Sequence, residues 1–380
     1  MDDSFKEIST IIHRDRKFNT YKFALIRATI ESINQYDHYV SIYPYYVKLP
    51  LGIQILKWLE YYYSIFSSNT FIAQQYGDKP ERSLAFRNLY NEVITFYFNH
   101  FGEGFEPIFN SLKEGKVAQE IKPTFIALIK KLKDTIVKNP MYYIGSSIDQ
   151  GGEIYRYNKD SNFRILYDSL SINTIIKSAG TYTIPKHYYE VFKIMGSYIL
   201  GMDSLIYKWA DFTLDLNKEK IQREKAISLV FKPLTQTRNV NEVKAFYIQM
   251  QKEKQLYCVW SGRKIKSDLN IDHLLPFSFY QNNDVWNLLP TTASINNKKR
   301  DSIPSSNLLN NRRRQIYDYW SLTENKFGMR FHSEIEFALL GSNKLVDDWK
   351  DMAFQNLQNK CEFLINDQGF EPFELRNDKA

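Results

Sequence analysis

The sequence predicts a mainly α-helical protein with a large helical N-terminal region, a short region that contains strands, and a helical C-terminal region. Three observations support this prediction. Apolar residues recur at helical spacing through residues 1–215, short β-like runs appear after residue 240, and helical spacing returns after residue 315. The length of 380 residues fits two or three domains.

Helical apolar spacing and capping residues predict a series of helices in the N-terminal region. Asn19 and Thr20 are good capping residues, and Pro50 and Pro185 suit the start of a helix. Paired glycines at 151 and 152 predict a small hairpin within residues 142–157. The predicted helices span residues 19–36, 51–66, 83–98, 124–138 and 185–212.

The second half of the chain is organised differently. A more polar, charged segment follows residue 216, so we expect residues 1–215 to form a helical domain and 216–252 a helical linker. Residues 256–260 and 270–276 are strand candidates, and residues 286–300 are expected to be helical in their second half. These runs define a module at 253–314, on which a helical region at 315–380 is expected to pack.

Composition excludes several classes of protein. Apolar residues make up 43% and charged residues 24% of the chain, which is typical of a globular protein rather than a disordered one. No apolar run reaches the roughly 18 residues of a transmembrane helix, and the first ten residues do not resemble a secretory signal. Cys258 and Cys361 are too few for a disulfide framework, so a reducing, cytoplasmic setting is expected.

Basic charge is concentrated in one segment. The net charge is +7, and residues 252–314 contain eleven basic and five acidic residues. This excess predicts DNA or another nucleic acid as the partner. No membrane partner is expected, because the chain lacks a long apolar run. Lys298, Lys299 and Arg300 are candidates for contacts to backbone phosphates, whereas the run at residues 312–314 fits either phosphate contacts or a solvated face.

Polar residues in the same segment suit the hydrolysis of a phosphodiester bond. Asp272 and His273 are adjacent at the end of a strand-like run, and Asn287 and Asn296 follow at spacings that a strand, loop and helix could bring together. A neutral histidine is the usual base for activating water near neutral pH. Magnesium prefers oxygen ligands, which the carboxylate of Asp272 and the amide of Asn296 would supply, while Asn287 could hold the histidine ring or the loop.

The segment from Cys258 to Lys299 resembles the HNH endonuclease superfamily, the ββα-metal nucleases. The matching motifs are Cys258-Val-Trp-Ser-Gly262, Ile271-Asp-His-Leu-Leu-Pro-Phe-Ser278, Asn287-Leu-Leu-Pro290 and Asn296-Asn-Lys-Lys299. The asparagine in the last place is similar to the variant in the HNH domains of CRISPR effector nucleases. The resemblance covers about 45 of the 380 residues.

The resemblance implies a role for each matched residue. His273 would be the catalytic base, and Asp272 and Asn296 would bind one catalytic Mg²⁺, with Mn²⁺ as a possible substitute. Asn287 would be the middle residue of the motif and support His273, and Lys299 would lie near the phosphate. The implied fold is a β-hairpin followed by a helix around one metal ion.

The sequence departs from the family where many members bind structural zinc. Cys258 has no cysteine partner, because Ser261, Thr292 and Ile295 stand at the other three positions. One thiolate does not make a zinc site, so packing by Trp260, Trp286 and Ile295 is expected to hold the hairpin instead.

The function expected from the sequence is a metal-dependent DNA endonuclease, with restriction or anti-phage defence as its suggested setting. Two alternatives stay open: a nucleic-acid-binding or regulatory protein built on an inactive HNH scaffold, and an RNA-cutting or RNA-guided nuclease. A homodimer or an effector partner would fit any of these functions.

Overall fold

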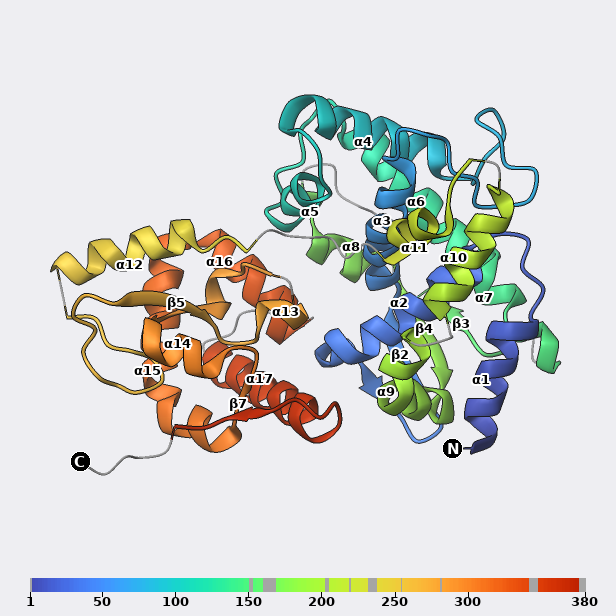
Figure 1. Ribbon diagram of the computed structural model, residues 1–380. Coiled ribbons are helices and arrows are strands. Elements are labelled where there is room, and N and C mark those ends of the chain that lie inside the picture. The colour runs from blue at the N-terminus through green and yellow to red at the C-terminus, as the bar shows by residue number, and fades with distance from the viewer. Residues whose placement is uncertain are drawn as a thin grey trace. The chain divides into compact units, whose positions relative to one another are not determined.

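The computed structural model divides the chain into two compact units, Met1–Leu234 and Thr235–Ala380 (Figure 1). Helices dominate both units, which confirms the mainly α fold class. No helix in the described ranges combines the length and the apolar character needed to cross a bilayer. The structure describes residues 2–149, 153–159, 169–201, 205–218, 220–231, 238–253, 255–280, 282–341 and 348–375.

The N-terminal unit is built from helices around an aromatic core. Buried aromatic rings from several helices pack together in that core, including Trp58, Tyr62, Phe86 and Trp209. The helices are α1 (Asp2–Arg14), α2 (Tyr21–Gln35), α3 (Leu51–Phe66), α4 (Arg87–Phe101), α5 (Glu106–Lys113), α6 (Lys122–Lys138), α7 (Pro140–Tyr143), α8 (Ile172–Ser178), α9 (Lys186–Leu200), α10 (Leu205–Leu216) and α11 (Arg223–Phe231).

A small antiparallel sheet accompanies these helices, with the strand order β1-β2-β4-β3. The expected hairpin within 142–157 is wrong for the described residues, because Tyr142 and Tyr143 end α7 and β3 pairs with β4 instead. The tip expected at residues 151–152 lies outside the described residues. Strand β3 pairs with β4, which is distant in sequence, because β4 carries the buried side chains of Tyr182 and Ile184. The strands are β1 (Ser41–Ile42), β2 (Tyr46–Pro50), β3 (Arg156–Asn158) and β4 (Thr181–Pro185).

The helix expected over residues 185–212 is two helices. Helix α9 ends at Leu200, Gly201 caps it, and α10 begins at Leu205. A side chain at position 201 would place its Cβ atom 3.0 Å from the Ser197 carbonyl oxygen, so glycine fits this helix end. Residues 202–204 lie outside the described residues.

Charged side chains are buried between α2 and α3. The guanidinium of Arg27 contacts Glu31 at 2.9 Å, and the ammonium of Lys57 contacts the other carboxylate oxygen of Glu31 at 2.9 Å. The guanidinium of Arg27 also lies 4.1 Å from the centre of the Tyr61 ring. Every charge in this cluster therefore has an opposite charge beside it.

The segment expected to be a linker, 216–252, contributes to both units. Helix α11 buries Ala226, Leu229 and Val230 in the N-terminal unit. Helix α12 buries Val243 and Tyr247 in the core of the C-terminal unit.

The C-terminal unit places two short strands and a helix among longer helices. Strand β5 pairs antiparallel with β6, and β7 pairs parallel with β8. The strands are β5 (Leu269–His273), β6 (Leu288–Thr292), β7 (Ile303–Pro304) and β8 (Pro372–Phe373). The helices are α12 (Asn241–Glu253), α13 (Phe277–Tyr280), α14 (Ala293–Lys299), α15 (Ser306–Phe327), α16 (Met329–Ile335) and α17 (Trp349–Asn366).

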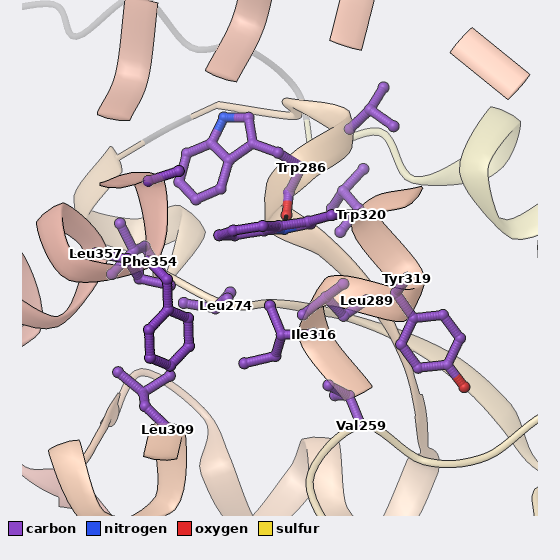
Figure 2. Close-up of a cluster of buried hydrophobic side chains, with 14 of the residues drawn as sticks. Val259, Leu274, Trp286, Leu289, Leu309, Ile316, Tyr319, Trp320, Phe354 and Leu357 are labelled. Atoms are coloured by element: carbon purple, nitrogen blue, oxygen red, sulfur yellow. Dashed lines mark hydrogen bonds between the residues drawn. The ribbon is translucent and has the colours of Figure 1, made fainter. Parts of the chain in front are cut away.

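One hydrophobic core holds these elements together (Figure 2). Trp320 of α15 lies under Trp286, and its indole N–H donates a 2.9 Å hydrogen bond to the Trp286 carbonyl. Phe373 of β8 packs edge-on against Trp260, with ring centres 6.2 Å apart. The strands near the candidate site therefore depend on α15 and β8 for their packing.

Candidate nuclease site

The ββα arrangement implied by the motif is present in the structure. Strands β5 and β6 pair so that His273 lies opposite Leu288 and Asp272 opposite Leu289. Helix α14 follows β6 directly, and the Thr292 hydroxyl caps it by accepting a 3.4 Å hydrogen bond from the Ile295 N–H. Helix α14 packs against both strands. This geometry brings the Asp272-His273 pair and the asparagine-bearing helix together.

His273 stands at the end of β5 and is 2% exposed. Neither ring nitrogen has a hydrogen-bond partner within the described part of the chain. The ring of Phe277 packs edge-on against the imidazole, with ring centres 5.4 Å apart. A buried imidazole with two free nitrogens can accept a proton from a ligand or a water molecule.

Burial lowers the pKa of His273 to about 3, and the positive charges of Arg238 and Lys299 act in the same direction. Asn283 lies near enough to favour the charged imidazolium, but not in hydrogen-bond geometry. The imidazole is therefore neutral near pH 7, which is the form that a general base requires.

Asn287 fixes the chain directly after His273. Its side-chain oxygen accepts a 2.8 Å hydrogen bond from the Leu275 N–H, and its side-chain N–H donates a 3.0 Å bond to the Leu275 carbonyl. Its own carbonyl accepts a 2.8 Å bond from the Leu274 N–H. Asn287 is fully buried, so these three bonds are shielded from water.

Asp272 is 2% exposed, and its carboxylate has two partners in the part of the chain that the structure describes. The indole N–H of Trp260 donates a 2.6 Å hydrogen bond to one oxygen, and the ammonium of Lys299 lies 3.4 Å from both oxygens. Burial raises the pKa of Asp272, although the contacts with Lys299 and Trp260 oppose that shift. A carboxylate accepts about four hydrogen bonds, so Asp272 keeps lone pairs for a cation.

Lys299 corrects one prediction. We expected its side chain to contact DNA phosphates, but it is fully buried. Its ammonium donates a 2.8 Å hydrogen bond to the His273 carbonyl and pairs with Asp272. In this structure, Lys299 therefore braces the end of β5 and is closed to DNA.

The other predicted residues of α14 lie on different faces. Asn296 is half-buried, and its amide makes no hydrogen bond with a described residue. Lys298 and Arg300 are exposed. Arg300 has a positive φ of 46° at the end of the helix, where its side chain donates to the Asn297 carbonyl at 3.3 Å.

Cys258 lies in a tight turn where many family members bind zinc. The run at 256–260, a strand candidate, forms only one isolated bridge, between Tyr257 and Lys264. The Cys258 sulfur accepts a 3.5 Å bond from the Ser261 N–H and lies 3.3 Å from the Thr291 hydroxyl. Within the described ranges, no group of three or more histidine, cysteine or acidic residues is placed to hold a metal ion.

Sequence reasoning missed two features of this site. Trp260 was expected only to pack, but its N–H also binds Asp272. Arg238 was not a candidate, although its charge acts on both Asp272 and His273. It lies twenty residues before the first motif residue, so no local pattern marks it.

Comparison with known proteins assigns both parts of the chain. A family model described as HNH endonuclease matches residues 258–305, and one described as Domain of unknown function (DUF8808) matches residues 1–230. No curated protein and no solved structure matches the chain significantly. The DUF8808 match covers more than half of the chain, and the HNH match contains the strands and helix around His273. The chain therefore belongs to the DUF8808 family and carries an HNH endonuclease domain in its C-terminal unit.

Proposed function

We propose that the protein is a metal-dependent DNA endonuclease in which His273 activates the attacking water. The observation that carries this proposal is the state of His273 beside Asp272: it is buried, neutral near pH 7, and neither ring nitrogen bonds to a described residue. A general base needs a neutral side chain with a free nitrogen that faces its substrate. The HNH match supports a nuclease-type hydrolase in general.

The residues present fit a hard divalent cation such as Mg²⁺. The oxygen donors are the Asp272 carboxylate and the Asn296 amide, which makes no hydrogen bond with a described residue. Magnesium is commonly held by one or two protein oxygens, with water and phosphate completing its shell. When bound, the ion supplies Lewis-acid stabilisation of the phosphate and of the leaving oxygen.

The chain's own residues divide the remaining work. The imidazole of His273 takes a proton from the water that attacks phosphorus, and Asn287 holds the turn that orients the imidazole. Lys299 fixes Asp272 and the His273 carbonyl in place. The exposed cations Lys298 and Arg300 are free to neutralise backbone phosphates.

The test is to incubate supercoiled plasmid DNA with the protein in Mg²⁺. We expect nicked or linear DNA, which EDTA and His273→Ala each abolish, and no cleavage of a matched RNA. The ratio of nicked to linear product reports whether two sites act together. Cleavage that persists in His273→Ala would refute the assignment of the base.

One observation favours a second candidate, a nucleic-acid-binding protein with an inactive HNH scaffold. Both oxygens of Asp272 already have partners in Trp260 and Lys299, so a cation must share the carboxylate with them. This candidate predicts DNA binding without cleavage in Mg²⁺ or Mn²⁺. It also predicts that Asn296→Ala leaves DNA binding unchanged at every metal concentration.

The biological setting we propose is restriction or anti-phage defence. Its support is the coupling of one HNH domain to a large helical unit of the DUF8808 family. We expect cells that express the wild-type protein to resist at least one phage, and cells that express His273→Ala to be sensitive. Equal plaque counts across a broad phage panel would contradict this setting.

A further inference from the structure

One face of the small sheet in the N-terminal unit is turned away from the core. The inward side chains of β2 and β4 are at most 1% exposed, and they are Val47, Leu49, Tyr182 and Ile184. The hydroxyl of Tyr182 accepts a 2.9 Å hydrogen bond from Gln54 of α3, so this side of the sheet packs on the helices. Side chains alternate along a strand, so the residues between these four belong to the opposite, outward face.

The strand register aligns the residues of the outward face in rows across the sheet. One row contains, in sheet order, Ser41, Lys48, Thr183 and Arg156. None of the side chains in this row is buried. The other outward strand residues are Tyr46, Pro50, Asn158, Thr181 and Pro185. Among the described strand residues, the outward face therefore carries two positive charges and no negative charge.

Exposed aromatic rings lie at one end of the outward face, where a tight turn joins β1 to β2. Tyr43 and Tyr46 flank the turn, and their rings stack with centres 4.7 Å apart and planes 19° apart. These rings are 40% and 42% exposed, and Tyr45 at the tip is 86% exposed. The turn is fixed, because the Tyr43 N–H donates a 2.9 Å bond to the Tyr46 carbonyl and the Lys186 N–H donates a 3.0 Å bond to the Tyr45 carbonyl.

Rings and charges in this arrangement suit the bases and phosphates of a single strand. An unpaired base stacks on an aromatic ring whatever its sequence, whereas a duplex keeps its bases inside its own stack. Tyr46 and Lys48 are two residues apart on β2, or about 7 Å, which a lysine side chain can span. A base on Tyr46 would therefore leave its phosphate within reach of Lys48, and Arg156 lies two strands, or about 10 Å, further along the row.

We propose that the outward face binds single-stranded DNA, with bases stacked on Tyr43, Tyr45 and Tyr46 and phosphates paired with Lys48 and Arg156. The inference goes beyond cleavage, because it gives the helical unit a binding role of its own. Only the choice of DNA over RNA rests on the proposed function. A second copy of the chain is disfavoured as the occupant, because it would bring the same positive charges against this face.

A binding measurement without cleavage tests the stacking. In a His273→Ala background with EDTA, fluorescence anisotropy gives the affinities for fluorescein-labelled oligo(dT) and for a blunt DNA duplex. Tyr46→Ala should weaken oligo(dT) binding about 10-fold, because one stacked base is lost, and leave duplex binding unchanged. Tyr46→Phe should bind like its parent, since stacking needs the ring rather than the hydroxyl. The matched control is Tyr142→Ala, which removes another exposed tyrosine ring of the N-terminal unit.

Two outcomes of this measurement would overturn the inference: an unchanged affinity for oligo(dT) in Tyr46→Ala, or an equal loss of affinity for the duplex. Melting temperatures show whether each variant folds. Tyr45 is the most exposed of the three rings, so Tyr45→Ala provides the same test should Tyr46→Ala fail to fold.

The phosphate contacts have a separate readout in the salt dependence of binding. Lys48→Gln and Arg156→Gln are each expected to reduce the slope of log affinity for oligo(dT) against log salt by about 0.7, which corresponds to one lost contact to a single strand. Slopes that match the parent in both variants would refute the proposed contacts.

Other occupants of the outward face give different results. A loss of affinity in Tyr46→Ala that is confined to oligo(U) would show that the ligand is RNA and refute the choice of DNA. Light scattering reports the oligomeric state. A dimer that Tyr46→Ala dissociates, with unchanged affinity for oligo(dT), would show that a second copy covers the face and refute the inference.

Failure of the proposed function is distinguishable from failure of this inference. If the wild type cuts no DNA but Tyr46→Ala loses affinity for oligo(dT), the proposed function fails and the binding face stands. If the wild type cuts DNA and Tyr46→Ala binds oligo(dT) like its parent, only the binding face is refuted.

Discussion

Both units bury charged or titratable side chains, but they do so in opposite ways. In the N-terminal unit, burial raises the pKa of Glu31, yet Lys57 and Arg27 outweigh burial and lower the pKa to about 2. In the C-terminal unit, burial and the nearby cations both lower the pKa of His273, and neither ring nitrogen bonds to a residue that the structure describes. The Glu31 cluster is compensated internally, whereas no described residue pairs with the imidazole nitrogens of His273.

This difference separates a structural cluster from a reactive one. A paired buried charge contributes to stability only while all of its partners remain, so removing one partner leaves another charge uncompensated. An imidazole without a hydrogen-bond partner gains no stability from hydrogen bonding, and such groups are often functional. Substitutions in the Glu31 cluster should therefore change the free energy of unfolding, whereas substitution of His273 should change the rate of cleavage.

The largest expected effect is on catalysis. His273→Ala should lower the cleavage rate about 10²- to 10⁴-fold, because it removes the base that we propose activates water. Its melting temperature should stay close to that of the wild type, because the imidazole makes no hydrogen bond with a described residue. The rate of plasmid nicking checks the effect on catalysis, and a thermal unfolding curve checks the melting temperature. A large fall in melting temperature would show that His273, like Glu31, has a structural role.

The next effect is on stability. Glu31→Gln should lower the free energy of unfolding of the N-terminal unit by about 3 kcal/mol, because it removes the counter-charge that Arg27 contacts and leaves Lys57 paired with Glu60 alone. The control is Glu114→Gln, which breaks an exposed ion pair with Lys116 and should lower the free energy of unfolding by less than about 1 kcal/mol. Denaturant titration measures the free energy of unfolding of both variants. Equal decreases would show that burial does not determine how much these ion pairs stabilise the fold.

Asn287→Ala should affect both stability and catalysis. It leaves the N–H and carbonyl of Leu275 without their partners, which should lower the free energy of unfolding by about 1–3 kcal/mol. The cleavage rate should fall as well, because the turn after His273 loses its anchor. Asn296→Ala is the comparison: we expect unchanged stability and a higher Mg²⁺ concentration for half-maximal cleavage. Identical behaviour of the two variants would contradict their separate roles.

The smallest effect concerns pH. His273 has a pKa of about 3 in the folded chain and about 6.5 when unfolded, so between these values the unfolded chain binds the extra proton. Stability is therefore fully present above pH 6.5 and falls as the pH drops toward 3. Lowering the pH from 6.5 to 5.5 in EDTA should cost the wild type about 1 kcal/mol more than His273→Ala. Parallel pH dependences in the two proteins would show that the histidine is not buried in its neutral form.

The sequence was most informative where neighbours in the chain are neighbours in space. The motif order correctly predicted a strand ending at His273, and the residues 286–300 form a helix in their second half, as expected. The Lys298-Lys299-Arg300 run misled because successive helical residues point about 100° apart. Lys299 turns inward on the side of Asp272, while its two neighbours face solvent.

Contacts between distant segments could not be predicted in the same way. The pairing of β3 with β4, the bond between Trp260 and Asp272 and the effect of the Arg238 charge on the pKa of His273 join residues with no shared local pattern. Each depends on how the units fold around their cores. A single sequence shows which residue types are available, but not which of them meet across a loop.

The pairing of β8 with β7 has a consequence for the order of events during synthesis. The residues proposed to act on the phosphate are all made by Lys299, but Phe373 completes the packing around Trp260, whose indole binds Asp272. At a translation rate of about 5–20 residues per second, Phe373 follows Lys299 by about 4–15 seconds. The packing around Asp272 is therefore completed only after Phe373 has been synthesised, and a chain that stops between Lys299 and Phe373 lacks the last support of this carboxylate.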